Sequence, residues 1–330
     1  MPFEIVRNDI TAMNADAIVN AANHFPLIGA GVDSAIHKKA GEKLLDARKK
    51  IGEIPFGDAA ITPAFGLPAK YVIHVVSPVW RGGGENETAL LESCYRKALS
   101  LALENDCESI AFPLLSAGNL GFPRDVALKC AVNVISDFLM RHEMRIFLVV
   151  FDFPSFALST KLFDTVKSFV DENYVDAKRT EEYGGSEAGI RGILARRRAD
   201  AIEAARKDIP LENLLSEVGE TFSEALVRLI DEKGFRDPDV YKRANIDRKF
   251  FSKIKNNRNY RPGKSVCVAF AIALELSLDE TREFIGKAGY TLAHSDKSDI
   301  IIEFFIRNRN YDIYEINETL FEFGQPILCG

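Results

Sequence analysis

Two side chains that could share one reaction stand one helical turn apart near the start of the chain. Asp33 and His37 occupy positions i and i+4 of a helical pattern, so they share a face and can touch. A carboxylate beside an imidazole can orient or activate a water molecule. The alternative interpretation is structural, with Asp33 as the helix N-cap and His37 as a half-buried histidine. The surrounding loops favour the chemical interpretation.

Glycine-rich loops near this pair are suited to an anion. The loop NAANHFPLIGAGVD precedes the helix, and Gly29 and Gly31 lack side chains, so main-chain amides can converge on an anion at the helix N-terminus. A second loop of the same design, LLSAGNLGFPRD, leads into a helix starting at Pro123. Two such loops at the carboxyl ends of strands predict a bound diphosphate. Neither loop matches GxGxxG or GxxxxGKS, the usual dinucleotide and nucleoside triphosphate fingerprints.

The elements that must position these loops alternate along the first 170 residues or so. Amphipathic segments predict helices around 33–50, 88–105, 123–142 and 156–172. Near-continuous apolar strands between them indicate a sheet covered on both faces, hence an α/β layered domain. The runs that predict strands are FEIVR, DAIVN, AAITPA, KYVIHVV, SIAFPLL and RIFLVVF.

Composition excludes several classes of function. The 330 residues carry a formal net charge of -6, which argues against whole-surface attraction to nucleic acid or anionic lipid. Five cysteines without a CxxC pair predict neither a disulfide framework nor a zinc site, so no metal or cofactor is expected. The N-terminus MPFEIVRND lacks the regions of a signal peptide, and no apolar run reaches membrane-spanning length. A reduced cytoplasmic protein is expected.

The chain changes character after residue 172, and its length favours two domains. Residues 173–210 are charged and predict a linker with a charged helix, whereas 211–330 are helical in pattern throughout. In the run VYKRANIDRKFFSKIKNN, Asn245 suits the left-handed corner of a helix–turn–helix and Asp247 suits an N-cap. Nine basic residues and one acidic residue between Lys242 and Lys264 make this run a local basic patch.

Several separated motifs of the N-terminal half occur in the order and spacing of one family. DAIVNAAN, GAGVD, AIHKKAG, LPAKYVIHVVSPVW and FPLLSAGNLGFP together resemble a macro domain, and closely the MacroD-type bacterial ADP-ribosyl hydrolases. The resemblance covers about residues 1–172. It implies a three-layer α/β/α fold that binds ADP-ribose. The implied activity is removal of mono-ADP-ribose from Asp or Glu of proteins, deacetylation of O-acetyl-ADP-ribose, or both.

The resemblance also implies roles at the two ends of the ligand. Asp9 would accept the adenine amino group beside the backbone of Ile10, and Phe151 would lie against adenine. Asn23 would hold the distal ribose. Main-chain amides would cradle the diphosphate along two segments: Gly29, Ala30, Gly31 and Val32, and Ser116, Ala117, Gly118, Asn119, Leu120, Gly121 and Phe122.

The implied catalytic residues are Asn23, Asp33 and His37. Asp33 would position or activate the attacking water, and His37 would support Asp33. A carboxylate at this place would also stabilise oxocarbenium character developing at the distal ribose. The family usually carries Phe or Tyr, packed on that ribose, where this chain has Leu120. The departure favours an alternative function, a reader that binds ADP-ribose without turning it over.

The basic run of the C-terminal half resembles a λ-repressor-like (XRE-type) helix–turn–helix, over about residues 222–290. Phe251 and Ile254 would form its inward stripe. Two interpretations remain open: contact with DNA or RNA that directs the macro domain, or a helical protein-interaction domain with a solvated basic face. The residues that would face a major groove are Arg248, Lys249, Ser252 and Lys253.

Overall fold

The structure is a computed structural model that describes residues 2–150, 166–167, 169–170 and 219–329. Contacts divide the chain into two compact units. The first comprises Met1–Thr160, Asp237–Phe251 and Asp312–Gly330, and the second comprises Lys161–Arg236 and Ser252–Tyr311. Phe151 and most of the helix predicted around 156–172 lie outside the described residues.

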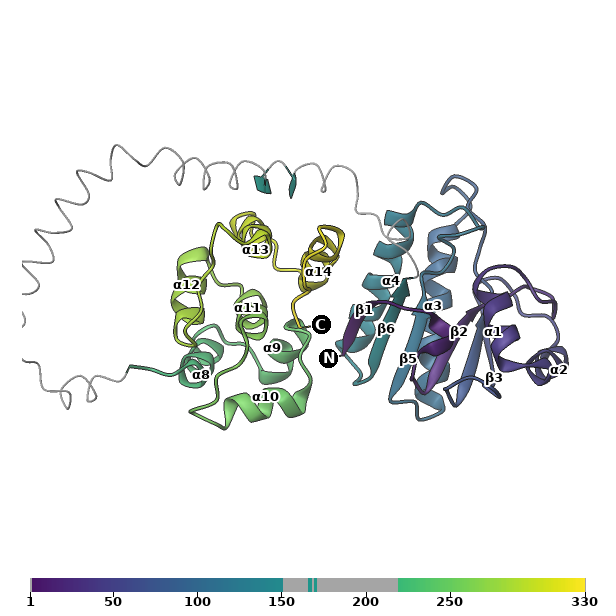
Figure 1. Cartoon of the computed structure of the whole chain (residues 1–330), viewed down its shortest axis with the longest axis horizontal. Coiled ribbons are helices and arrows are strands. Elements are labelled where there is room, and N and C mark those ends of the chain that lie inside the picture. The colour runs from purple at the N-terminus through teal and green to yellow at the C-terminus, as the bar shows by residue number, and fades with distance from the viewer. Residues whose placement is uncertain (1, 151–165, 168, 171–218, 330) are drawn as a thin grey trace, which may run out of the picture. The chain divides into compact units, whose positions relative to one another are not determined.

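A six-stranded sheet with the order β1-β6-β5-β2-β4-β3 forms the centre of the first unit (Figure 1). Five strands run parallel, and β3 at one edge pairs antiparallel with β4. Each of the six runs that predicted a strand forms one. The strands are β1 (Phe3–Arg7), β2 (Ala17–Ala21), β3 (Ala59–Pro63), β4 (Tyr71–Val75), β5 (Ser109–Pro113) and β6 (Arg145–Val150).

Helices cover both faces of this sheet because both faces of its strands are apolar. In β6, Ile146 and Leu148 join one buried cluster while Phe147 and Val149 join the other, as alternation along a strand requires. The first cluster includes residues of α3 (Glu87–Glu104) and α4 (Arg124–Leu139), and the second includes residues of α1 (Val32–Ala40) and α2 (Glu42–Ile51). The predicted three-layer α/β/α fold is confirmed.

One predicted element differs in a way that matters for the site. The helical pattern around 33–50 is two helices, α1 and α2, because Gly41 between them has φ 85°, a left-handed value that favours glycine. Gly41 is the C-cap of α1 and the N-cap of α2. Arg48 of α2 reaches the loop that follows β2.

Parallel pairing brings the predicted loops to one edge of the sheet. Because β1, β6, β5, β2 and β4 are parallel neighbours, their carboxyl ends all lie at the same edge. The loop after β2 is adjacent to the loop after β5, since these two strands pair directly. The short 3-10 helix η1 (Ile10–Ala12) follows β1 at this edge.

The rest of the described chain is helical, as predicted for the C-terminal half. Capping boxes begin two of these helices, with Thr221 and Glu224 at α8 and Ser277 and Glu280 at α12. No helix among the described residues is long and apolar enough to cross a membrane. The helices are α8 (Phe222–Glu232), α9 (Asp237–Arg243), α10 (Arg248–Lys255), α11 (Lys264–Ala273), α12 (Leu278–Gly286), α13 (Lys297–Arg307) and α14 (Ile313–Glu322).

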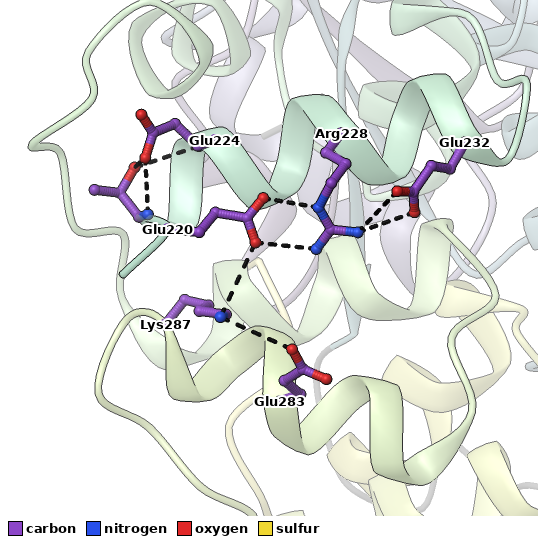
Figure 2. A network of polar contacts seen from close by, with 7 residues as sticks. Glu220, Glu224, Arg228, Glu232, Glu283 and Lys287 are labelled. Carbon is purple, nitrogen blue, oxygen red and sulfur yellow. Dashed lines mark hydrogen bonds and ion pairs between the residues drawn. The ribbon is translucent and has the colours of Figure 1, made fainter. Parts of the chain in front are cut away.

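A chain of charges joins α8 to α12 in the second unit (Figure 2). Arg228 bonds Glu220 at 2.7 and 3.0 Å and Glu232 at 2.9 and 3.1 Å. Lys287 lies 4.0 Å from Glu220 and 3.8 Å from Glu283. Exposed ion pairs of this kind contribute about 1 kcal/mol or less each. The buried contact of Phe222 with Phe284, whose ring centroids are 4.5 Å apart, is the stronger link between the two helices.

The segment from α9 to α10 has the local geometry that its sequence predicts. Asn245 in the connection has φ 53°, and Asp247 accepts a hydrogen bond from the main chain of Phe250 at 2.9 Å. Phe251 and Ile254 are buried. Membership of the λ-repressor-like group stays a prediction. The four side chains expected to face a groove, Arg248, Lys249, Ser252 and Lys253, are exposed.

Candidate functional site

Asp33 is the centre of a buried polar cluster at the start of α1. It is 2% exposed, and its carboxylate accepts hydrogen bonds from the Gly29 main-chain N–H and, at 2.5 Å, from the side-chain amide of Asn20. His37 Nε2 lies 3.5 Å from Asp33 Oδ1, so the predicted pair does meet. The N-cap interpretation of Asp33 is wrong, because the helix begins at Val32 and its N-cap is Gly31.

Three further residues, which the sequence did not single out, form a hydrogen-bonded chain that ends at Asp33: Thr62, His74 and Asn20. Asn20 and His74 are direct partners across β2 and β4. The carboxylate can only accept, so the Asn20 amide faces it with its NH₂ group, which also lies 3.2 Å from His74 Nδ1. His74 Nδ1 is thereby the acceptor, and its Nε2–H donates to Thr62 Oγ1 at 3.0 Å. Their occurrence as polar residues within otherwise apolar strands was the sequence signal that could have identified them.

Both buried imidazoles are neutral at neutral pH. Burial lowers the pKa of His37, against the opposing pull of Asp33, and the positive charge of Arg48 lowers it further. Burial, with smaller effects from Arg48 and His37, lowers the pKa of His74 to about 3. Asn20 Oδ1 and His37 Nδ1 are buried and have no hydrogen-bond partner among the residues that the structure describes. The cluster therefore has hydrogen-bonding capacity left for a water molecule or a substrate group.

The loop after β2 presents fewer amides than its glycines suggest. The N–H of Gly29 is already bonded to Asp33, and a Cβ added at Gly29 would lie 3.2 Å from Asp33 Oδ2. Gly31 has φ 65°, a backbone conformation that is strained for residues with a side chain. The amides of Ala30, Gly31 and Val32 remain for an anion at the start of α1. Asn23 is exposed at the beginning of this loop.

The loop after β5 is held in a strained conformation. Ser116 has φ 63° although it is not glycine, and its hydroxyl donates to the carbonyl of Pro78 at 3.1 Å. Non-glycine residues kept in this region cluster at functional sites, where the surrounding structure fixes them. The Gly121 N–H bonds Gly118 O at 3.1 Å, and the Phe122 N–H bonds Ser116 O at 3.2 Å. The amides from Ala117 to Leu120 are those left for a ligand.

Phe122 does not replace the aromatic side chain that the family usually places at Leu120. Phe122 is 3% exposed and packs on Trp80, with ring centroids 4.8 Å apart. Trp80 in turn donates its main-chain N–H to the Leu120 carbonyl at 2.9 Å. The two aromatic rings therefore support the loop from within, and Leu120 carries the side chain at the position of the missing aromatic.

Asp9 follows β1 at the same edge of the sheet. One oxygen of its exposed carboxylate accepts from the N–H and hydroxyl of Thr11, at 2.9 and 2.8 Å, which caps η1 and fixes the side chain. Ile10, beside it, is buried. Among the described residues, no group of three or more His, Cys, Asp and Glu side chains could hold a metal ion. The five cysteines are buried and free.

Comparison with known proteins adds a separate observation. Residues 19–131 match the family model described as Macro domain. The O-acetyl-ADP-ribose deacetylase of Citrobacter koseri is 49% identical over 156 residues, which cover 46% of this chain and 88% of that protein. The chain belongs to the macro domain family.

Other proteins match the macro domain of this chain over a similar extent. The macro domain-containing protein of Methanosarcina mazei is 49% identical over 142 residues, covering 43% of this chain and 76% of that protein. A solved structure, the Oceanobacillus iheyensis macrodomain with ADP, is 37% identical and covers 48% of this chain and 84% of that chain, with a TM-score of 0.44.

Proposed function

We propose that the macro domain binds ADP-ribose and hydrolyses the ester bond between its distal ribose and a carboxylic acid. The substrate is then O-acetyl-ADP-ribose, a protein carrying mono-ADP-ribose on Asp or Glu, or both. The names of relatives such as the Citrobacter koseri deacetylase support an ester substrate. In this proposal the macro domain spans about residues 1–172, and 173–210 link it to a helical domain at 211–330. No cofactor takes part.

The order of site residues along the sheet edge is the observation that carries this proposal. Asp9 follows β1, the Ser116 loop follows β5, and Asn23 follows β2, and the sheet order is β1-β6-β5-β2. Adenine, diphosphate and distal ribose occur in the same order in ADP-ribose. Three interstrand steps span about 14 Å, a distance that only an extended ligand of several linked groups can bridge.

Asp33 supports hydrolysis at the ribose end of this ligand. Its carboxylate is buried and held by Gly29 and Asn20, with the neutral His37 beside it. In the proposed step, Asp33 accepts a proton from water as the water oxygen attacks. The water oxygen bonds to the electrophilic carbon of the ester as the bond of that carbon to the leaving oxygen breaks. Asp33 returns its proton to the leaving oxygen, so a carboxylic acid and ADP-ribose are released and the carboxylate is restored. A base fixed in position before the reaction needs no reorganisation during it.

Asp9→Ala is expected to weaken ADP-ribose binding by about 1–3 kcal/mol, because a charge-assisted contact with the adenine amino group is lost. Calorimetry with the full chain measures this change, and AMP and free ribose should bind much more weakly than ADP-ribose. Asp46→Ala, an exposed carboxylate on α2, is the matched control and should leave affinity unchanged. No detectable heat with ADP-ribose at millimolar concentration would end the proposed binding function.

A nucleic-acid-directed role is a second proposal, favoured by the exposed polar face of α10. Arg248, Lys249, Ser252 and Lys253 are exposed on it while Phe251 and Ile254 are buried. Phosphate contacts release condensed counterions, so affinity for duplex DNA should fall steeply with salt. The Lys253 ammonium also lies 4.7 Å from the Tyr260 ring centroid.

The double change Arg248→Ala/Lys253→Ala is expected to weaken DNA binding and to flatten the log–log salt slope by up to about 1.8, or 0.9 per lost contact. Fluorescence anisotropy with the full chain and a labelled duplex measures both quantities. Lys43→Ala/Lys50→Ala, two exposed cations of α2, is the control. Absence of binding at about 50 mM salt would leave the helical half as a protein-interaction module.

A further inference from the structure

Arg48 of α2 is a buried cation whose hydrogen bonds go to main-chain carbonyls. It is 2% exposed, and one terminal nitrogen donates to the carbonyls of Asn23 at 3.1 Å and His24 at 3.2 Å. The other terminal nitrogen donates to the carbonyl of Gly52, directly after α2. These are the hydrogen bonds of the guanidinium among the described residues. The side chain thus ties the end of α2 to the loop that follows β2.

Capping of α2 alone does not account for a buried guanidinium. An exposed lysine or arginine can satisfy carbonyls at a helix C-terminus, and burial of an ionised group is costly unless it is well bonded. The two other contacts reach residues that precede Arg48 by 25 and 24 positions. Neutral, well-packed residues often replace a buried charge without loss of stability. The specific consequence of the cation is the fixed main chain at Asn23 and His24.

Within the described part of the chain, His24 has a second set of main-chain and ring contacts, whereas Asn23 has only its bond from Arg48. His24 makes two hydrogen bonds with Ile54. The His24 ring nitrogen Nδ1 lies 2.6 Å from the Ile54 carbonyl, and the Ile54 N–H donates to the His24 carbonyl at 3.1 Å. The Asn23 carbonyl is bonded by Arg48. Because the Asn23 side chain is exposed, its position depends on how its main chain is held.

Arg48 also acts on the charge of the cluster around Asp33. The groups that face His37 are Asp33 on its own helix, Arg48 on α2 and His74 on β4. Arg48 lowers the pKa of His37 and of His74, in both cases after the larger effect of burial. The Asp33 carboxylate in turn counteracts the lowering of the Arg48 pKa by burial. The guanidinium is therefore electrostatically linked to Asp33 and His37.

We propose that Arg48 is a positioning residue that sets specificity for the distal ribose, by fixing the Asn23 main chain beside the Asp33 and His37 pair. This inference rests on the proposed function of the site. The inference distinguishes two parts of the ligand. ADP lacks the distal ribose and so does not need Asn23 itself, whereas ADP-ribose does. Removal of Arg48 should therefore reduce the advantage of ADP-ribose over ADP and leave the ADP contacts intact.

The test is calorimetry of the full chain with ADP and with ADP-ribose, for the wild type, Arg48→Met, Arg48→Lys and the control Lys49→Met. Arg48→Met should weaken ADP-ribose binding about tenfold, since three main-chain carbonyls lose their donor, and change ADP binding by about twofold or less. Arg48→Lys keeps the charge but cannot reproduce the fork of contacts, so it should recover only part of the loss. Lys49 is exposed on the same helix, and its variant should match the wild type.

Titration of His37 by NMR provides a readout that a purely structural role would not move. Arg48→Met should raise the pKa of His37, and Arg48→Lys should leave it near the wild-type value, because the charge is what lowers it. Equal losses of ADP and ADP-ribose affinity, or no loss of either, would overturn the inference. If Arg48→Met does not fold, Arg48→Lys gives the same comparison of ligands. Failure of the wild type to bind ADP-ribose would instead refute the proposed function itself.

Discussion

Asp33→Asn is expected to slow hydrolysis of O-acetyl-ADP-ribose by about 100-fold or more, while ADP-ribose affinity stays within a few-fold of the wild type. General base catalysis contributes about 10²–10⁴-fold, and an amide cannot accept the proton of the attacking water. The substitution preserves side-chain volume, and its oxygen can still accept the Gly29 N–H. Steady-state kinetics and calorimetry on the same preparations measure the two quantities.

Some loss of stability is expected in this variant, because the introduced NH₂ group cannot also accept from Asn20. Thermal unfolding therefore accompanies the kinetics, and Asp46→Asn on the exposed side of α2 is the control for the charge change. If affinity and turnover fell by the same factor, Asp33 would be a loop-holding residue. That outcome would remove it from the chemistry.

Acidification is expected to destabilise the macro domain through His74, by about 4–5 kcal/mol in total between pH 6.5 and pH 3. The pKa of His74 falls from 6.5 to about 3 in the folded protein, chiefly through burial. Below pH 6.5 the unfolded chain binds a proton that the folded chain does not. The free energy of unfolding therefore decreases as the pH is lowered from 6.5 to about 3. One pKa unit corresponds to about 1.4 kcal/mol. The lowered pKa of His37 acts in the same direction.

Urea unfolding at pH 7 and pH 4 measures this effect, followed by the fluorescence of Trp80, the single tryptophan of the chain. Across this interval His74→Gln should lose about 3 kcal/mol less stability than the wild type, because the titrating group is gone. His142→Gln is the control, since His142 stacks on Phe138 outside the buried cluster. An equal loss in wild type and His74→Gln would show that other groups cause the acid sensitivity.

Local pattern was sufficient for the strands, since runs such as SIAFPLL and RIFLVVF are apolar on both faces and admit one assignment in an α/β layer. The meeting of Asp33 and His37 followed from helical spacing, which is also local. Gly41, which separates α1 from α2, is a single residue whose left-handed conformation becomes visible only in the folded chain.

The remainder of the site depends on contacts between distant residues. Asn20 meets His74 only because β2 pairs with β4 in one register, and Thr62 joins them from β3. In the segment EKLLDARKKI, nothing distinguishes Arg48 from the exposed cations beside it. Its role follows only from the packing of α2 beside the loop after β2. Tertiary pairing decides such partners, and helical or strand periodicity carries no information about them.

The same limit applies to the anion loops. Their glycines predict that main-chain amides converge on a ligand. They do not predict which of these amides are already hydrogen-bonded within the protein. The N–H groups of Gly29, Gly121 and Phe122 are taken by Asp33 and by the second loop itself. Leu120 stands where the family usually has an aromatic side chain, and its main chain, not its side chain, is fixed by the bond from Trp80.

The most direct test of the proposed activity is incubation of the 330-residue protein with O-acetyl-ADP-ribose, with ADP-ribose formation followed over time beside the Asp33→Asn variant. A parallel reaction uses a protein mono-ADP-ribosylated on Asp or Glu. The wild type is expected to release ADP-ribose from at least one of the two substrates, and the variant is expected to do so at least about 100-fold more slowly. Tight binding of ADP-ribose by a wild type that releases none above the uncatalysed rate would contradict the hydrolase proposal and identify a reader.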